Sequence, residues 1–116
     1  MTDKIVVLVT CPSMKEARKI AGAIVQRRLA ACANILEVPV RSTYRWKGKV
    51  ESAREFLILI KTVRRKFGAL KAAIRALHSY EVPEIIALPI AEGLPEYLAW
   101  ISECVIAPRP RVKGRR

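Results

Sequence analysis

Three short segments of this chain are apolar at every position, and they constrain its fold more than any other feature. The runs are Ile5–Val9, Phe56–Ile60 and Ile85–Leu88. Runs this short and rich in β-branched residues predict strands. A strand with one face open to water alternates apolar and polar side chains, and these runs do not alternate. The sheet that they form must therefore be covered on both faces.

Segments with other periodicities lie between these runs. Ser13-x-x-Glu16 is a capping box, which predicts the start of a helix. Pro39 marks a bulge or an edge within a strand, and Lys47-Gly48 predicts a tight turn. The expected elements, in chain order, are strand 4–10, helix 13–31, strand 33–46, strand 50–63, helix 64–77, strand 84–90 and helix 94–105.

The order β-α-β-β-α-β followed by a terminal helix predicts the α+β class and a ferredoxin-like split β-α-β sandwich. In this fold both main helices lie on one face of an antiparallel sheet. They leave the second face uncovered, and an uncovered apolar face would be a large exposed hydrophobic patch. We therefore expect a homo-oligomer that packs through its sheets.

Cysteine usage and hydropathy bear on the cellular compartment. The chain has 3 cysteines and no CxxC pair, which argues against a disulfide framework or a structural zinc site. No apolar run approaches the roughly 20 residues of a membrane helix, and the N-terminal block is short for a signal peptide. The expected location is the cytoplasm, with no membrane partner. Single Asn and Gln residues fit a thermostable protein.

Basic charge is concentrated at the C-terminal end. The net charge of the 116-residue chain is +12, and the final segment, RPRVKGRR, is rich in Lys and Arg and has no acid. We expect a folded domain over residues 1–108 and a disordered basic tail over 109–116. Such a tail predicts weak, non-specific binding to polyanions.

A basic ferredoxin-like nucleic-acid-binding protein is the main alternative. RNA-recognition modules stack bases on aromatic side chains of the sheet, whereas the apolar runs here contain only Phe56. An acylphosphatase-like enzyme would need a glycine-rich loop after the first strand, and CPSMKEA has no glycine. No P-loop, GxSxG motif or catalytic triad can be assembled either, so we expect no enzyme.

Three motifs resemble the CutA family of divalent cation tolerance proteins: RLAACANI, YRWKGK and YEVPEIIALPI. The resemblance covers about residues 4 to 104. It implies a ferredoxin-like subunit in a tight homotrimer, with an architecture like that of the PII signalling proteins. It also implies a role in metal-ion response, copper above all, or in signalling by small ligands bound in clefts between subunits.

The resemblance also implies a metal site. The family's metal ligands, a first-strand cysteine and two adjacent histidines, would fall on Val9, Leu77 and His78, so only His78 matches. Cys11 lies two residues beyond Val9 and shares its strand face if the strand extends that far. We therefore predict His78 and Cys11 as ligands for copper or another divalent cation. The alternative is that His78 bonds free carbonyls at a helix C-terminus.

Five further residues are candidates for a ligand cleft: Tyr44, Trp46, Lys61, Tyr80 and Glu84. Tyr44 and Trp46 could instead pack an interface. Lys61 could bind an anionic ligand or pair with Glu84, or it could be an edge charge that discourages misassembly. Tyr80 and Glu84 could simply shape the entry into the last strand.

Overall fold

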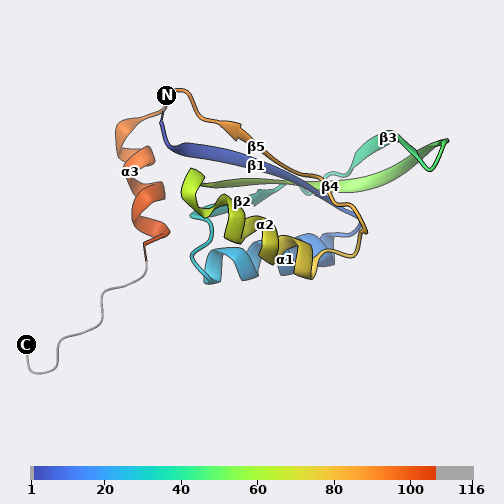
Figure 1. Ribbon diagram of the computed structural model, residues 1–116, viewed down its shortest axis with the longest axis horizontal. Coiled ribbons are helices and arrows are strands. Elements are labelled where there is room, and N and C mark those ends of the chain that lie inside the picture. Colours follow the sequence, from blue (N-terminus) through green and yellow to red (C-terminus); the bar gives the residue numbers. More distant parts are fainter. Residues whose placement is uncertain (1, 107–116) are drawn as a thin grey trace, which may run out of the picture.

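An antiparallel sheet in the order β2-β4-β1-β5 forms one layer of the molecule (Figure 1). The computed structural model describes residues 2–106. The strands are β1 (Lys4–Cys11), β2 (Cys32–Ile35), β3 (Val40–Trp46), β4 (Lys49–Val63) and β5 (Ile85–Pro89). β1 lies between β4 and β5, and β3 pairs with the first half of β4. This topology confirms the ferredoxin-like α+β fold.

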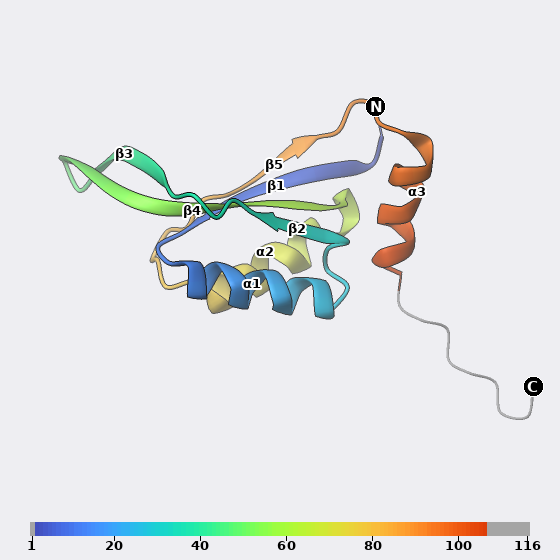
Figure 2. The ribbon, with the colours of Figure 1, turned by 180° about the vertical axis from the view of Figure 1, so that it is seen from behind.

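Two helices cover one face of the sheet, as Figure 2 shows from behind. They are α1 (Met14–Gln26) and α2 (Phe67–Leu77). Each buries the stripe that its periodicity predicts. The core is the contact between these stripes and the inward side chains of β1 and β4, and it includes Val7, Val9, Ile20, Ile24, Ile58, Ile60, Leu70 and Ile74.

The opposite face of the sheet is also apolar. Val6 and Leu8 on β1 and Leu59 on β4 are half-buried there, while Ile86 and Leu88 on β5 are both 48% exposed. No helix of residues 2–106 lies over this face (Figures 1 and 2). We call it the open face. Its composition explains why these strands do not alternate.

The expected strand 33–46 is wrong as a single element, because residues 36–39 separate β2 from β3. Pro39 has no N–H to give to the sheet, and Val38 next to it is 76% exposed. Residues 2–106 thus contain five strands. Lys47 and Gly48 have φ values of 51° and 81°, which is the conformation of a tight hairpin turn between β3 and β4.

Two helix boundaries also differ from expectation. α1 ends at Gln26 and not at residue 31, because Arg28 adopts a φ of 57°, which ends the helix. Residues 64–66 form a 3-10 turn before α2, so the α-helix itself begins at Phe67. The terminal helix α3 (Pro95–Cys104) packs through Ile101 against Ala31 and Val63 at one end of the sheet. Within residues 2–106 no helix is long and apolar enough to span a membrane. The boundary at 108 and the basic tail lie outside the described residues.

Candidate metal centre

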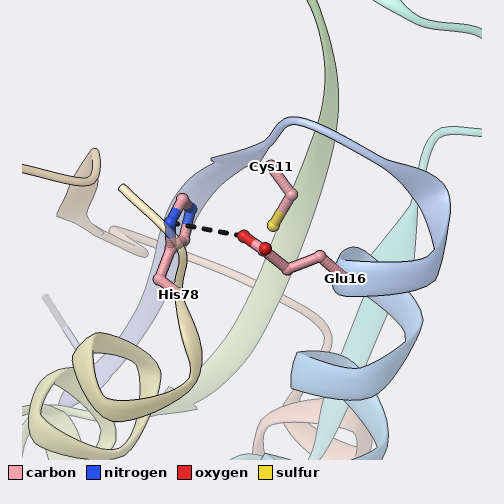
Figure 3. A group of neighbouring side chains, drawn as sticks. All are labelled: Cys11, Glu16 and His78. Atoms are coloured by element: carbon pink, nitrogen blue, oxygen red, sulfur yellow. Dashed lines mark ion pairs between the residues drawn. The ribbon is translucent and has the colours of Figure 1, made fainter. Parts of the chain in front are cut away.

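Cys11, Glu16 and His78 converge where β1, α1 and α2 meet (Figure 3). One potential ligand atom from each lies within 4.8 Å of the others. β1 and β4 are antiparallel neighbours and each is followed by a helix, so the start of α1 lies beside the end of α2. The topology thus joins residues that are more than sixty positions apart in the chain.

Cys11 is the last residue of β1, so the strand extends far enough to place it on the same face as Val9. Its side chain is fully buried. Burial, followed by the charges of Glu16 and Glu55, raises the pKa of the Cys11 thiol to about 12. The thiol therefore holds its proton at neutral pH unless a cation displaces it.

His78 caps the C-terminus of α2, and its side chain is fully buried. Its Nε2 lies 2.8 Å from the carbonyl oxygen of Thr10, and its Nδ1 accepts a hydrogen bond of 3.1 Å from the N–H of Tyr80. A carbonyl can only accept, so Nε2 carries the proton and Nδ1 presents its lone pair. The imidazole thus bonds a carbonyl of β1, not the free carbonyls of its own helix that the alternative interpretation expected.

Glu16 was missed as a candidate ligand because the capping box already accounted for it. Ser13 Oγ does accept the N–H of Glu16 at 3.1 Å, as the motif predicts. The Glu16 carboxylate, however, turns toward α2: its Oε2 accepts the N–H of Ser79 at 3.2 Å and lies 3.4 Å from His78 Nδ1. A sequence signal did exist, since Glu16 begins the helix that directly follows Cys11.

The donor set fits a transition-metal ion. A thiolate and an imidazole suit soft and borderline ions, and the carboxylate adds a charged oxygen. Metal–ligand bonds of about 2.0–2.3 Å put neighbouring ligand atoms roughly 3.5–4 Å apart, so a small inward movement would close this set. The hydrogen bond from Nε2 to Thr10 fixes the ring and its tautomer, as outer partners of metal-bound histidines do.

The predicted cleft residues are only partly brought together. The Tyr80 hydroxyl donates a 2.8 Å hydrogen bond to Glu55, a residue of β4 that sequence reasoning missed and that is 6% exposed. Burial, then the hydrogen bond to Glu55, raises the pKa of Tyr80. Partial desolvation and the Glu55 charge raise the pKa of Glu84, while the charge of Tyr44 also acts on Tyr80. Tyr80 is thus bonded to Glu55, and Glu84 lies near enough for the charge of Glu55 to raise its pKa.

Lys61 and Trp46 lie away from this group. Lys61 is opposite Val6 on β1 and bonds the side chain of Asn34, whereas Glu84 precedes the residue opposite Val9. Pairing of Lys61 with Glu84 is therefore wrong. Trp46 is at the hairpin tip, where Lys47 lies 5.7 Å from its ring centroid.

Comparisons with known proteins agree with the fold and with the resemblance seen in the motifs. The family model described as "CutA1 divalent ion tolerance protein" matches residues 5–104. The "Divalent-cation tolerance protein CutA" of Thermus thermophilus is 56% identical over 99 residues, covering 84% of this chain and 94% of that protein.

Solved structures give the same result. CutA from Xylella fastidiosa superposes with a TM-score of 0.87 at 42% identity, covering 90% of this chain and 100% of that one. The periplasmic divalent cation tolerance protein CutA from Archaeoglobus fulgidus gives 0.85 at 42% identity, covering 89% and 99%. With its fold, its motifs and nearly its whole folded length matched, this chain belongs to the CutA1 family of divalent ion tolerance proteins.

Proposed function

We propose that this protein is a non-enzymatic, homotrimeric copper-binding protein whose metal site is Cys11, Glu16 and His78. One observation carries the proposal. The lone pair of His78 Nδ1 and the Glu16 carboxylate, two acceptors, face each other at 3.4 Å beside a thiol. Two acceptors attract only when a proton or a metal cation lies between them. A cation there would also displace the proton of Cys11.

Binding is favoured over catalysis because the three groups are enclosed. His78 and Cys11 are buried, and the side chain of Glu16 is 15% exposed. The raised pKa of Cys11 disfavours a free thiolate nucleophile. A site that holds its ligands away from solvent is suited to retaining an ion.

The site also offers a way to report that an ion is bound. A cation at His78 Nδ1 competes with the N–H of Tyr80 for the same lone pair. Tyr80 is hydrogen-bonded to Glu55, next to Glu84. Metal binding would therefore shift the segment between α2 and β5 and change the ligand cleft proposed around Tyr44, Tyr80 and Glu84. This coupling fits a role in the response to metal ions.

Three further properties belong to the same proposal. The open face supports assembly as a homotrimer. The free cysteines support a cytoplasmic location, although the Archaeoglobus fulgidus protein is described as periplasmic. Non-specific polyanion binding by the tail at 109–116 stays a prediction from the sequence.

The test is a competition titration of Cu(I) against a chelator under reducing conditions. The binding free energy of a four-ligand structural zinc site is roughly 10–16 kcal/mol, which is about 3 kcal/mol for each ligand if it is shared equally. Cys11→Ser and His78→Ala should therefore each weaken copper binding about a hundredfold. On the same equal sharing, the double variant should bind more weakly than either single variant, because it removes two ligands of one site. Glu16→Gln should weaken binding less, since it keeps an oxygen but loses the charge.

The matched control is Cys32→Ser with Cys104→Ser, which removes two of the three thiols and leaves the site intact. This variant should bind like the wild type. If it loses copper binding while Cys11→Ser does not, the proposed site is wrong.

A further inference from the structure

The fold brings most of the basic side chains of residues 2–106 onto the helical side, although they are spread over two distant segments of the sequence. We define the helical layer as segments 13–28 and 64–78, which include α1, α2 and their flanking turns. It carries ten Lys and Arg residues and one acid, Glu16. The rest of residues 2–106 carries seven Lys and Arg against nine acids. The folded domain therefore has one strongly basic side.

Five cations of this layer lie on the exposed sides of the two helices, and five lie in the turns that follow α1 and precede α2. They are Lys15, Arg18, Lys19, Arg27, Arg28, Arg64, Arg65, Lys66, Lys71 and Arg75, and all are exposed except Lys66, which is half-buried. The inner sides of the two helices pack on the sheet, so the cations on the helices point away from it. Among the others, Arg28 bonds the carbonyl of Cys104 and Arg65 pairs with Asp3. α1 and α2 lie side by side on the same face of the sheet (Figures 1 and 2).

Few of these charges are neutralised within residues 2–106. Arg18 pairs with Glu37 at 3.9 Å, and Arg65 pairs with Asp3 at 3.8 Å. Both ion pairs are long and well exposed, so each contributes little. The other eight cations make no ion pair with any described residue. A surface with this much uncompensated positive charge attracts polyanions and raises their association rate.

We propose that the helical layer is a docking surface for the phosphate backbone of duplex nucleic acid, bound without regard to base sequence. Six of the ten cations are arginines, which bind phosphate oxygens bidentately. The exposed side chains between the cations are mostly small, as at Gly22, Gly68, Ala69, Ala72 and Ala76. Side chains this small let a nucleic-acid backbone approach closely.

The same side chains argue for a duplex over other anionic partners. Insertion into a membrane needs large apolar side chains among the cations, and Val25, at 40% exposed, is an isolated one. Recognition of single strands needs exposed aromatic rings, and Phe67, the aromatic residue of this layer, is half-buried. The surface is also opposite the open face, so docking would not compete with self-association.

The experiment compares two full-length variants that each lose three positive charges. One is Lys19→Gln, Lys71→Gln, Arg75→Gln in the helical layer. The matched control is Arg109→Gln, Arg111→Gln, Lys113→Gln in the tail. Binding to a fluorescein-labelled 20-base-pair duplex of random sequence is followed by anisotropy between about 50 and 200 mM salt, the range in which phosphate contacts show their salt dependence.

We expect the helical-layer variant to bind at least about tenfold more weakly at 50 mM salt, and its salt slope to fall by about 2 to 3, since each phosphate contact contributes about 0.9. The tail variant should lose less. Equal losses would mean that net charge alone matters, and a larger loss in the tail variant would place binding there; either result overturns the proposal. So would tighter wild-type binding to phosphatidylserine vesicles than to the duplex. Unchanged circular dichroism and native mass exclude unfolding.

Discussion

At the scale of single residues, Cys11 has the most distinctive chemistry among the described residues. Its thiol is a ligand candidate, yet burial and two nearby carboxylates keep it protonated. The two facts are compatible, because a metal cation supplies the charge that a thiolate needs. Copper affinity at this site should therefore rise with pH throughout the neutral range, as the proton becomes easier to displace.

The raised pKa of Cys11 also predicts a loss of stability at alkaline pH. The pKa rises from 9.0 to about 12 on folding, so the folded state holds the thiol proton more tightly than the unfolded state. The corresponding stability is complete below pH 9 and is lost as the pH rises toward 12. At pH 10.5 the loss should be about 2 kcal/mol relative to pH 8.

Urea unfolding at a fixed chain concentration checks this expectation at both pH values. Cys11→Ala should lower the free energy of unfolding at pH 8 by about 1 kcal/mol, because packing around the thiol is lost. Between pH 8 and 10.5, however, the variant should lose less stability than the wild type, because it has no thiol at this position to ionise. The raised pKa of Tyr80 adds a further decline above pH 10 in both proteins. If wild type and variant decline by the same amount between pH 8 and 10.5, Cys11 does not carry the effect.

At the scale of elements, the β3–β4 hairpin depends on its two-residue turn. Lys47 and Gly48 both adopt positive φ, as a turn compatible with the twist of the two strands requires. A Cβ on Gly48 would meet no atom within 4 Å, so any cost of substitution there is conformational and not steric. The chain offers a matched glycine in α1: a Cβ on Gly22 also meets nothing, and its backbone is helical.

Gly48→Ala and Gly22→Ala should therefore change stability in opposite directions. The first forces alanine into the left-handed region and should cost about 1–2 kcal/mol. The second should stabilise by about 0.5–1 kcal/mol, because alanine restricts the unfolded chain and favours the helix. Thermal unfolding of both variants measures the difference. A Gly48→Ala protein as stable as wild type would show that the hairpin tip adopts another turn in solution.

At the scale of the whole molecule, the two faces differ in their chemistry. The helical layer is basic and open to solvent, while the open face is apolar. Because the helices occupy one face only, further copies of the chain are the natural cover for the other. Ile58 and Leu59 are neighbours on β4 that point to opposite faces: Ile58 is fully buried under the helices, and Leu59 is half-buried on the open face.

This pair gives a test of the trimer. Light scattering coupled to gel filtration should give the wild type three times the chain mass of 13.0 kDa. Leu59→Lys should lower the mass toward one chain, because it would bury an unpaired charge in the interface. Ile58→Lys should instead lower stability by several kcal/mol through the core. A Leu59→Lys protein with unchanged mass and stability would show that the open face is not the interface.

Much of this architecture could be read from the sequence because it depends on local patterns. The apolar runs, the helical stripes and the capping serine depend on residues a few positions apart, and they led to the order of elements and the ferredoxin-like fold. The missing alternation within the apolar runs also indicated that the second face of the sheet is apolar. Cys11 and His78 were predicted as ligands from the family resemblance, and a single strand period placed Cys11 on the face of Val9.

The tertiary structure decided where distant side chains meet. Glu16 fitted its local motif completely, so only the packing of α1 against the end of α2 showed that its carboxylate faces His78. Strand register placed Lys61 beside Asn34 and away from Glu84. The path of the chain after α2 brought the Tyr80 hydroxyl within hydrogen-bond distance of Glu55. The basic helical layer likewise exists only because two helices separated by three strands lie side by side. Local patterns fix a residue's element and face, but strand register and helix packing fix its neighbours.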